Sequence, residues 1–532
     1  MRLAHVALAS PTALAVLATF AISASACRQS GTTPSMPESP SSPPPLAGTT
    51  LRNTPDAPFR EKAPPPEGHI TFAPPKINEF KLKNGVRVLL AERHDLPIVS
   101  VRVVIGVGAG DAGGARPGLV SFVGQMLEQG TKKRSALAIS DDYEAIGASH
   151  AAWFDWDSGG ASVKVLVNEL DAALDILSDV VLAPTFPEVE IERTRARRIA
   201  SIKAEKSSPG AIAQNVLAPA IFGRAHPYGH TLGGEEADAK SLTRQELVST
   251  YHRLFQPTNA TLIVAGDVTR EVLQPKLEAS FGVWKGRQRD KASKPISNQG
   301  PERARKQAAG GRIVIANMPG AQSQVLVARE GARFSNKDRD AIVVTSTILG
   351  GMFSSRINLN LREKHAYTYG ARSQVQMRHG AGPLLVGASV VADKTVPAIR
   401  EMFVELDGMC QGGATDEELA LAKESLVLGM PGRFETVADV AGAMADLAIY
   451  DLPLDEYEKK PARIMNVTKA DVKRQACELF APNAMTVIIV GNKEKLAPEL
   501  GALGAFGLGA FDERDAYGNP ITADRPSGSQ VK

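Results

Sequence analysis

The stretch Leu254-Phe-Gln-Pro-Thr-Asn-Ala-Thr-Leu-Ile-Val-Ala-Gly-Asp267 occurs in a second version further along this chain. It aligns without a gap with Leu479-Phe-Ala-Pro-Asn-Ala-Met-Thr-Val-Ile-Ile-Val-Gly-Asn492. The residues upstream agree too, because Thr243 and Thr468 stand at the same offset and each opens a segment that resembles a helix capping box. A helix cap, a helix, Leu-Phe-x-Pro and a closing strand in one register indicate a duplicated domain of roughly 220 residues.

Each copy mixes strands and helices without regular β-α-β alternation, which favours an α+β layered domain. Asn84-Gly85 is flanked by alternating apolar residues and predicts a hairpin. Residues 99–106 predict a further strand. Helical patterns follow at 118–127, 167–182 and 187–204.

Composition shifts predict the domain boundaries. We expect a first domain at 68–290 and a second at 311–500. A linker at 291–310 lies in a stretch rich in Lys, Arg, Ser, Gln and Gly. The tail at 501–532 is Gly/Ala-rich and then polar, so we expect it to add little to a core.

The bulk composition is that of an ordinary globular protein with more than one domain. The chain has 532 residues, 43% of them hydrophobic and 22% charged. A formal net charge of +3, without a basic stripe interleaved with aromatic residues, argues against a nucleic-acid partner. The chain also lacks a serine-nucleophile elbow and a phosphate-binding P-loop.

The N-terminus predicts export. A basic start is followed by an Ala/Leu/Val-rich stretch at about 6–22, and small residues lead into Cys27. This pattern resembles a bacterial lipoprotein signal, so we expect a signal peptide at 1–26 and a lipid on Cys27. Ordinary secretory cleavage near Ala26 is the alternative. Residues 27–67, rich in Ser and Pro, should form a semi-rigid tether that holds the globular part in the periplasm, with the outer membrane as the preferred anchor.

The other two cysteines, Cys410 and Cys477, are far apart and show neither a disulfide framework nor the clustered spacing of a zinc site. An exported compartment would permit a disulfide between them. We expect two buried free thiols instead.

The chemistry of the chain is indicated by Gly118-Leu-Val-Ser-Phe-Val-Gly-Gln-Met-Leu-Glu-Gln-Gly-Thr131. This segment resembles the H-x-x-E-H helix of the insulinase/pitrilysin-like zinc metallopeptidases, in which two histidines one turn apart bind zinc and the glutamate activates a bound water. Here those positions hold Ser121, Gly124 and Gln125. None of the three can supply an imidazole or a carboxylate.

The resemblance covers the chain from near His69 to Gly501. It implies two halves, each an antiparallel sheet with helices packed on one face, that close as a clam around a chamber. The second half is similar to the non-zinc half of the family, which includes the mitochondrial processing peptidases. The remaining segments that carry the resemblance are Ile146–Ala148, His226–Tyr228, Val264–Asp267, Leu349–Arg356 and Asn360–Gly370.

The resemblance also implies a third zinc ligand, a glutamate on a downstream helix. Ser201 stands at that position, and Thr194 stands at the supporting acidic position. With every direct ligand and the general base replaced, we expect no metal on this chain and zinc on a partner chain. Glu128, one turn past the motif, is expected to be a solvated residue.

The histidines offer no clear replacement site. His226 and His230 have H-x3-H spacing, but Pro227 and Gly229 argue against a helix that would present both rings together. A structural role is therefore expected, with metal binding as the alternative. His150 is expected to be a partly exposed strand residue.

Arg362 and Tyr369 match an Arg/Tyr pair that, in the family, reaches the substrate near the zinc. A guanidinium offers forked donors, and a phenol can donate to a carbonyl oxygen. The resemblance therefore implies that both contact substrate. The alternative is that Arg362 caps a helix and Tyr369 packs beneath it.

The resemblance, with its zinc positions replaced, implies a catalytically incomplete homologue that pairs with a zinc-bearing peptidase subunit and helps to bind an extended peptide, by strand addition to a sheet edge. One alternative is an active metalloendopeptidase with a non-standard site. The other is a purely structural subunit, like the inactive core subunits of respiratory complexes.

Overall fold

The computed structural model describes residues 73–112, 116–286 and 311–521, which lie in one compact unit. The predicted signal peptide, Cys27, the tether and the predicted linker lie outside the described residues.

A six-stranded sheet forms the first half, in the order β1-β2-β6-β3-β5-β4. Neighbouring strands are antiparallel except β2 and β6, which run parallel. The central strands are rich in Val, Ile and Leu and are buried almost throughout, as expected of a sheet covered on both faces. The strands are β1 (Asn78–Lys81), β2 (Arg87–Glu92), β3 (Ile98–Ile105), β4 (Ser149–Phe154), β5 (Gly159–Leu166) and β6 (Ala260–Gly266).

A second six-stranded sheet follows, in the order β12-β7-β11-β8-β10-β9. Here β7 runs parallel to both β11 and β12. Its strands are β7 (Gly311–Asn317), β8 (Gln322–Glu330), β9 (Thr368–Val375), β10 (Pro383–Val391), β11 (Thr486–Gly491) and β12 (Leu508–Arg514).

The duplication is visible in the strand order. The repeated stretch forms β6 in one half and β11 in the other. Strand β6 lies between β2 and β3, and β11 lies between β7 and β8; each is parallel to the first strand named and antiparallel to the second. Thr243 and Thr468 both cap helices through capping boxes, as predicted. The α+β class with two tandem domains is confirmed. Both sheets are mixed, however, so the prediction of antiparallel sheets is corrected.

The tail also differs from expectation. Residues 500–514 form a short 3-10 helix and strand β12, and Leu500, Leu503 and Leu508 are buried in the second core. The Gly/Ala-rich composition hides this contribution, because few apolar side chains carry it.

Helices cover both sheets. In the first half they are α1 (Leu119–Met126), α2 (Ala136–Ala145), α3 (Leu170–Leu182), α4 (Glu188–Glu205), α5 (Pro209–Phe222), α6 (Glu236–Ser241), α7 (Arg244–Leu254) and α8 (Arg270–Phe281). In the second they are α9 (Arg339–Ser346), α10 (Arg356–Asn358), α11 (Thr395–Gly412), α12 (Asp416–Leu428), α13 (Val437–Ile449), α14 (Glu456–Met465), α15 (Lys469–Leu479) and α16 (Lys493–Leu496). The helical run 339–364 is long and apolar enough to span a membrane. However, 61% of its most apolar window is buried inside the protein, as in a core helix.

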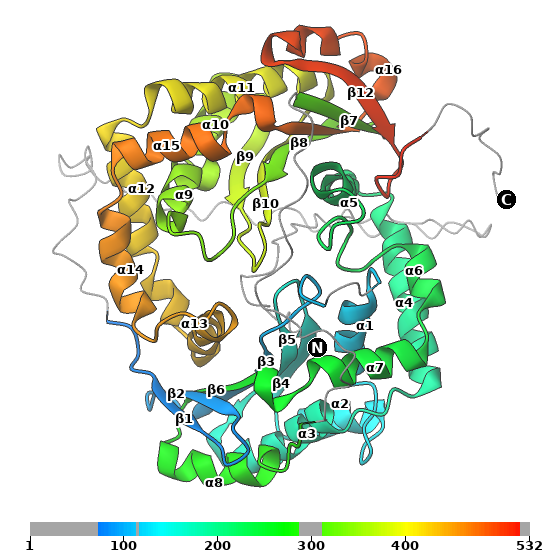
Figure 1. The fold of residues 1–532 in the computed structure, drawn as a ribbon, viewed down its shortest axis with the longest axis vertical. Helices are drawn as coiled ribbons and strands as arrows, with labels where there is room; N and C mark the ends of the chain where they lie inside the picture. The colour runs from blue at the N-terminus through cyan, green and yellow to red at the C-terminus, as the bar shows by residue number, and fades with distance from the viewer. Residues whose placement is uncertain (1–72, 113–115, 287–310, 522–532) are drawn as a thin grey trace, which may run out of the picture. The chain divides into compact units, whose positions relative to one another are not determined.

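Each half contributes one helix that packs on the sheet of the other half (Figure 1). Helix α5 of the first half packs its Ile212 and Val216 against Ile488 and Val490 of the second sheet. Helix α13 of the second half packs apolar residues, including Met444, against the first sheet. Each sheet is therefore covered on its second face by a helix from the other half, and not on one face only.

Helices α11 and α15 are joined by a disulfide between Cys410 and Cys477. The prediction of two free thiols is wrong. The two cysteines are distant in sequence, but the helices that carry them pack side by side.

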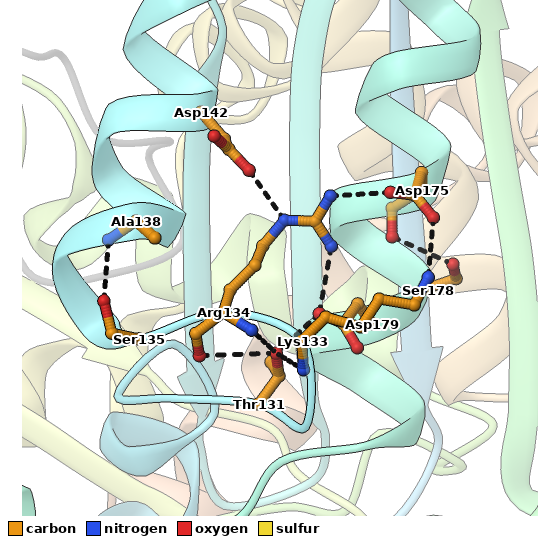
Figure 2. Close-up of polar contacts among 9 residues, drawn as sticks. All are labelled: Thr131, Lys133, Arg134, Ser135, Ala138, Asp142, Asp175, Ser178 and Asp179. Atoms are coloured by element: carbon orange, nitrogen blue, oxygen red, sulfur yellow. Dashed lines mark hydrogen bonds and ion pairs between the residues drawn. The ribbon is translucent and has the colours of Figure 1, made fainter.

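Helix α1 is followed by a loop that an ion network anchors (Figure 2). The Arg134 guanidinium donates to Asp142 at 2.7 Å, to Asp175 at 2.6 Å and to the buried Asp179 at 3.0 Å. Thr131, the last residue of the quoted motif, also donates to Asp179. The chain leaving α1 is thereby held against α2 and α3.

Candidate functional site

The helix that resembles a zinc helix begins at a glycine that no other residue can replace without strain. Gly118 has a φ of 80°, in the left-handed region, and a Cβ there would lie 2.4 Å from the Gly233 carbonyl oxygen. The loop around Gly233 is therefore packed directly on the start of α1. Ser121, one turn later, donates from its Oγ to the Leu232 carbonyl at 2.8 Å.

Arg198 of helix α4 lies against Ser121 and Gln125, two of the predicted degenerate zinc-site positions. Its Nη2 donates to Ser121 Oγ at 2.7 Å, and its Nη1 donates to Gln125 Oε1 at 3.3 Å. Its Nε donates to the Gly233 carbonyl at 3.0 Å, and its guanidinium stacks over Phe122. Arg198 is only 6% exposed. The two positions at which the sequence comparison predicts zinc-binding histidines in active relatives are thus bridged by one buried guanidinium.

The electrostatics of this place disfavour a metal. Burial lowers the pKa of Arg198 to about 10, with the charges of Asp238 and Glu205 acting against the shift. The guanidinium therefore stays protonated at neutral pH. Its partners are a hydroxyl, an amide and a backbone carbonyl, and no ion pair joins it to a carboxylate within the described part of the chain. A fixed cation among neutral acceptors does not fit Zn²⁺, which needs anionic or imidazole ligands.

Gly124, at the position predicted to correspond to the catalytic glutamate, leaves no room for any side chain. A Cβ there would lie 2.8 Å from the Phe154 backbone nitrogen and 2.9 Å from the Trp153 carbonyl carbon. Strand β4 therefore packs its backbone directly on α1 at this point. Main chain therefore occupies the space next to the predicted general-base position.

Ser201 does not take part in this cluster. The buried stripe of α4 consists of Ile191, Thr194, Arg198 and Ile202, and Ser201 is exposed. The residue of α4 that reaches Ser121 and Gln125 is Arg198, which was not among the predicted site residues. The predicted positions Ser121 and Gln125 are brought together, and Thr194 is buried nearby on the same stripe.

Glu128 is paired, contrary to expectation. Its Oε1 lies 2.8 Å from His150 Nδ1 on strand β4, and the His150 ring stacks on Tyr143 with centroids 4.1 Å apart. Both partners are half-buried. The pair therefore joins the end of α1 to β4.

His226 and His230 make separate local contacts. His226 Nδ1 accepts from the Tyr228 amide, and its ring stacks on Phe222. His230 Nδ1 lies 2.8 Å from the Thr231 carbonyl oxygen. These contacts agree with the structural role predicted for the loop.

Arg362 and Tyr369 lie on adjacent elements of the second half. Arg362 is in the π-helical turn Leu359–Lys364, stacks over Phe353 with its Cζ 4.6 Å from the ring centroid, and lies 3.4 Å from Glu363. Tyr369 is the second residue of β9 and is 89% exposed. The alternative, in which Tyr369 packs beneath a helix, therefore does not agree with its exposure.

Strands β4 and β9 are terminal in their sheets, so each has one side without a partner strand among the described residues. Strand β4 lies next to α1, and β9 lies next to the turn with Arg362. The candidate site thus consists of two free sheet edges, one beside the predicted zinc-site positions of α1 and one beside the Arg/Tyr pair.

A buried polar cluster between the halves was not foreseen from the sequence. Ligand-type atoms of Asp111, Asp157 and His379 lie within 4.8 Å of one another. His379 Nδ1 is 2.9 Å from Asp111 Oδ2, and Nε2 is 2.9 Å from the Ile449 carbonyl oxygen, which can only accept. No spacing signal could have found this cluster, because its members are scattered over the chain.

The protonation of His379 decides what this cluster can do. Burial opposes the charged ring, but the hydrogen bond to Asp111 and the charges of Asp111 and Asp157 outweigh it and raise the pKa of His379 to about 9. The imidazolium donates from both nitrogens and has no lone pair for a metal. The cluster therefore suits an internal ion pair better than a metal ion.

Comparisons with known proteins agree with this architecture. Residues 87–235 match the family model described as insulinase (peptidase family M16), and residues 241–426 match the model described as peptidase M16 inactive domain. An uncharacterized zinc protease of Streptomyces coelicolor is 25% identical over 431 residues, 80% of this chain and 92% of that protein.

Two solved structures share the fold. The peptidase M16 inactive domain from Pseudomonas fluorescens gives a TM-score of 0.71 at 23% identity and covers 78% of this chain and 98% of its own. The periplasmic protease PqqL from Escherichia coli gives a TM-score of 0.67 at 16% identity, and the match covers 86% of this chain and 52% of the PqqL chain.

Proposed function

Because this chain belongs to the insulinase (M16) family of peptidases, we propose that it is a catalytically incomplete member of that family. In this proposal it pairs with a zinc-bearing homologue and contributes peptide binding. The zinc and the water-activating glutamate are then supplied by the partner.

The proposal rests chiefly on the position of the Arg198 side chain. Its guanidinium bridges Ser121 and Gln125, and the backbone of β4 occupies the space in front of Gly124. Replacement of the ligands is therefore accompanied by filling of the place where they would meet. A chain built in this way has no route to the zinc chemistry of its family through the usual helix.

The second half retains what a substrate-binding partner needs. Arg362 is 39% exposed, and its stacking on Phe353 limits the orientations of the guanidinium. The Tyr369 hydroxyl is open to solvent. A forked cation and a phenol on neighbouring elements can donate to the carbonyl groups of an extended peptide.

The free edges support binding by strand addition. An extended peptide can pair its backbone with an edge strand, and both β4 and β9 offer one. Strand β9 also carries the exposed Tyr369, so a peptide on this edge would lie beside that side chain.

We further propose that the chain is exported and anchored in a bacterial envelope through Cys27. The disulfide Cys410–Cys477 supports an oxidising compartment, since such bonds are rare in the cytosol. The similarity to a periplasmic protease of Escherichia coli agrees with this localisation. Mass spectrometry of the chain isolated from membranes would reveal a diacylglycerol-modified Cys27, and an unmodified mature N-terminus would contradict lipidation.

The test is a peptidase assay with the co-purified partner. The pair should cleave a peptide and the lone chain should not. Arg362→Ala and Tyr369→Phe should each lower kcat/KM of the pair by about 10²-fold. Arg474→Ala, at a similarly exposed arginine (40%), and Tyr367→Phe, at a neighbouring tyrosine, are the matched controls and should have little effect.

Two outcomes would overturn the proposal. Unchanged activity of the pair with both Arg362→Ala and Tyr369→Phe would indicate a purely structural subunit. Chelator-sensitive cleavage by the lone chain would indicate a metalloendopeptidase with its own site.

A further inference from the structure

Two hairpin turns from opposite halves of the chain meet in a buried contact. Residues 155–158 connect β4 to β5, and residues 376–382 connect β9 to β10. The amide of His379 donates to Asp157 Oδ2 at 3.0 Å, although the two residues are 222 positions apart. The turns therefore belong to the two hairpins that carry the free sheet edges.

The loop after β3 completes the contact. Asp111 accepts from the Gly108 amide at 3.0 Å and from His379 Nδ1 at 2.9 Å. The amides of Ala109 and Gly110 donate to the carbonyls of Asp155 and Trp156. The His379 side chain is thus held against both the β3 loop and the β4–β5 turn.

Two tyrosines connect further elements to the same carboxylate. Tyr450, at the end of α13, donates to Asp157 Oδ2 at 2.9 Å. Tyr228, in the loop after α5, lies 3.4 Å from Asp157 Oδ1 and accepts from the Gly380 amide at 3.1 Å. Helices α5 and α13, each packed on the sheet of the other half, therefore both lead into this cluster.

The cluster balances its charges. Arg378 stacks over Trp156 and Tyr228, so the turn 376–382 contributes two cations against the carboxylates of Asp111 and Asp157. Side-chain exposure is 4% for His379, 0% for Asp111 and 7% for Asp157. Removing one partner from such a buried set leaves an uncompensated charge, which is strongly unfavourable.

We infer that His379 is a positioning residue that locks the β9–β10 hairpin to the β4–β5 hairpin, so that the two free edges move as one body. This inference rests on the proposed function only for its consequence, namely that the lock fixes the edge carrying Tyr369 where a peptide would bind. The lock itself follows from the contacts.

The charge of His379 makes the lock sensitive to pH. Asp111 from the β3 loop and Asp157 from the β4–β5 turn act on it with negative charge, and the Tyr450 ring from the end of α13 lies 5.4 Å from its ring. Arg378 precedes it in its own turn, and Tyr228 from the loop after α5 contacts Asp157. As the pH rises toward 9, the ring loses its proton and cannot donate to both Asp111 and the Ile449 carbonyl. The lock should weaken.

Hydrogen exchange on the full chain tests the lock without peptide or partner. In His379→Gln, amides in 155–158 and 376–382 should exchange at least about tenfold faster at neutral pH, while those of α3 should not change. Protection of these segments in the unmodified chain should fall as the pH approaches 9, and in His379→Gln it should not. His94→Gln is the control, because His94 pairs with Asp267 at 2.7 Å on the surface within one half.

Tyr228→Phe, which removes only one hydroxyl, provides a second test in case His379→Gln does not fold. It should speed exchange at Gly380 in particular. Unchanged exchange in both turns would overturn the inference. In the assembled pair, His379→Gln should raise KM with little change in kcat, and faster exchange with an unchanged KM would overturn the positioning role. If Arg362→Ala and Tyr369→Phe show no peptide contact, the proposed function fails and exchange alone decides the lock.

Discussion

Arg198 carries its positive charge in a place that water hardly reaches, and it is held there by neutral acceptors. A second, divalent cation among the same atoms would be repelled at short range in a medium of reduced dielectric. The guanidinium ties α4 to α1 through its hydrogen bonds to Ser121 and Gln125.

Arg198→Ala should therefore destabilise the fold. It removes the hydrogen bonds to Ser121, Gln125 and Gly233 and leaves a cavity, so we expect a loss of about 2–3 kcal/mol in the free energy of unfolding. Denaturant titration measures this loss. Arg193→Ala, at an exposed arginine of the same helix, should change it by less than about 0.5 kcal/mol. Equal effects of the two substitutions would contradict the bridging role.

Restoring the family motif should not restore a metal site. The triple change Ser121→His, Gly124→Glu and Gln125→His introduces a Cβ at position 124 that would lie 2.8 Å from the Phe154 backbone nitrogen. It also leaves the Arg198 guanidinium in place. We expect lower stability and no stoichiometric zinc by elemental analysis. A zinc ion retained by this variant would show that the position is still open.

Single residues show where prediction from sequence stops. That Ser121, Gly124 and Gln125 offer neither imidazole nor carboxylate can be read from the sequence alone. Arg198 was one of several arginines on a strongly charged helix, and only packing distinguishes the buried one. A one-residue difference in helical phase separates Arg198 from its exposed neighbour Arg197.

At the scale of elements, the disulfide between α11 and α15 should contribute measurably. It closes a loop with a sequence separation of 67, for which the chain-entropy estimate is about 4 kcal/mol. The double change Cys410→Ser and Cys477→Ser should lower the unfolding free energy by about 2–4 kcal/mol. Reductant should destabilise the unmodified chain and leave the double variant unchanged. Free thiols at both positions in the native protein would contradict the bond.

The strands show what a repeat can and cannot reveal. The matching stretches located β6 and β11 correctly, because both are apolar runs with the same flanking turns. Whether β6 runs parallel to β2, and β11 parallel to β7, depends on the path of the long segments that connect these strands. The local sequence pattern carries no information on that path. The packing of α5 and α13 on the sheet of the other half escaped prediction for the same reason, since an apolar helix face does not state which sheet it will cover.

For the molecule as a whole, stability should depend on pH through His379. Its folded pKa, about 9, lies above the unfolded value of 6.5. The contribution is therefore fully present below 6.5 and is lost as the pH rises through 9, up to about 3 kcal/mol. Burial raises the pKa of Asp157 to about 6, although the charge of His379 opposes this shift. The raised pKa of Asp157 likewise makes the free energy of unfolding fall as the pH rises, but at lower pH than for His379. Denaturant titrations from pH 6 to 9.5 should show this loss, and His379→Gln should lack it. An equal loss in both proteins would contradict the assignment.

Contacts between the halves were beyond reach of the sequence. Asp111 and His379 are separated by 268 positions, and neither belongs to a motif. The duplicated architecture was predictable because each half repeats a pattern. The cluster that joins the halves lies outside that pattern.

The proposal that this chain holds no zinc of its own is tested most directly by the zinc content of the purified, unmodified protein. The chain is incubated with excess zinc, desalted and analysed for metal, and its peptidase activity is measured in parallel. We predict well under one zinc ion per chain and no chelator-sensitive cleavage. One zinc ion retained per chain, together with cleavage that a chelator abolishes, would contradict the account.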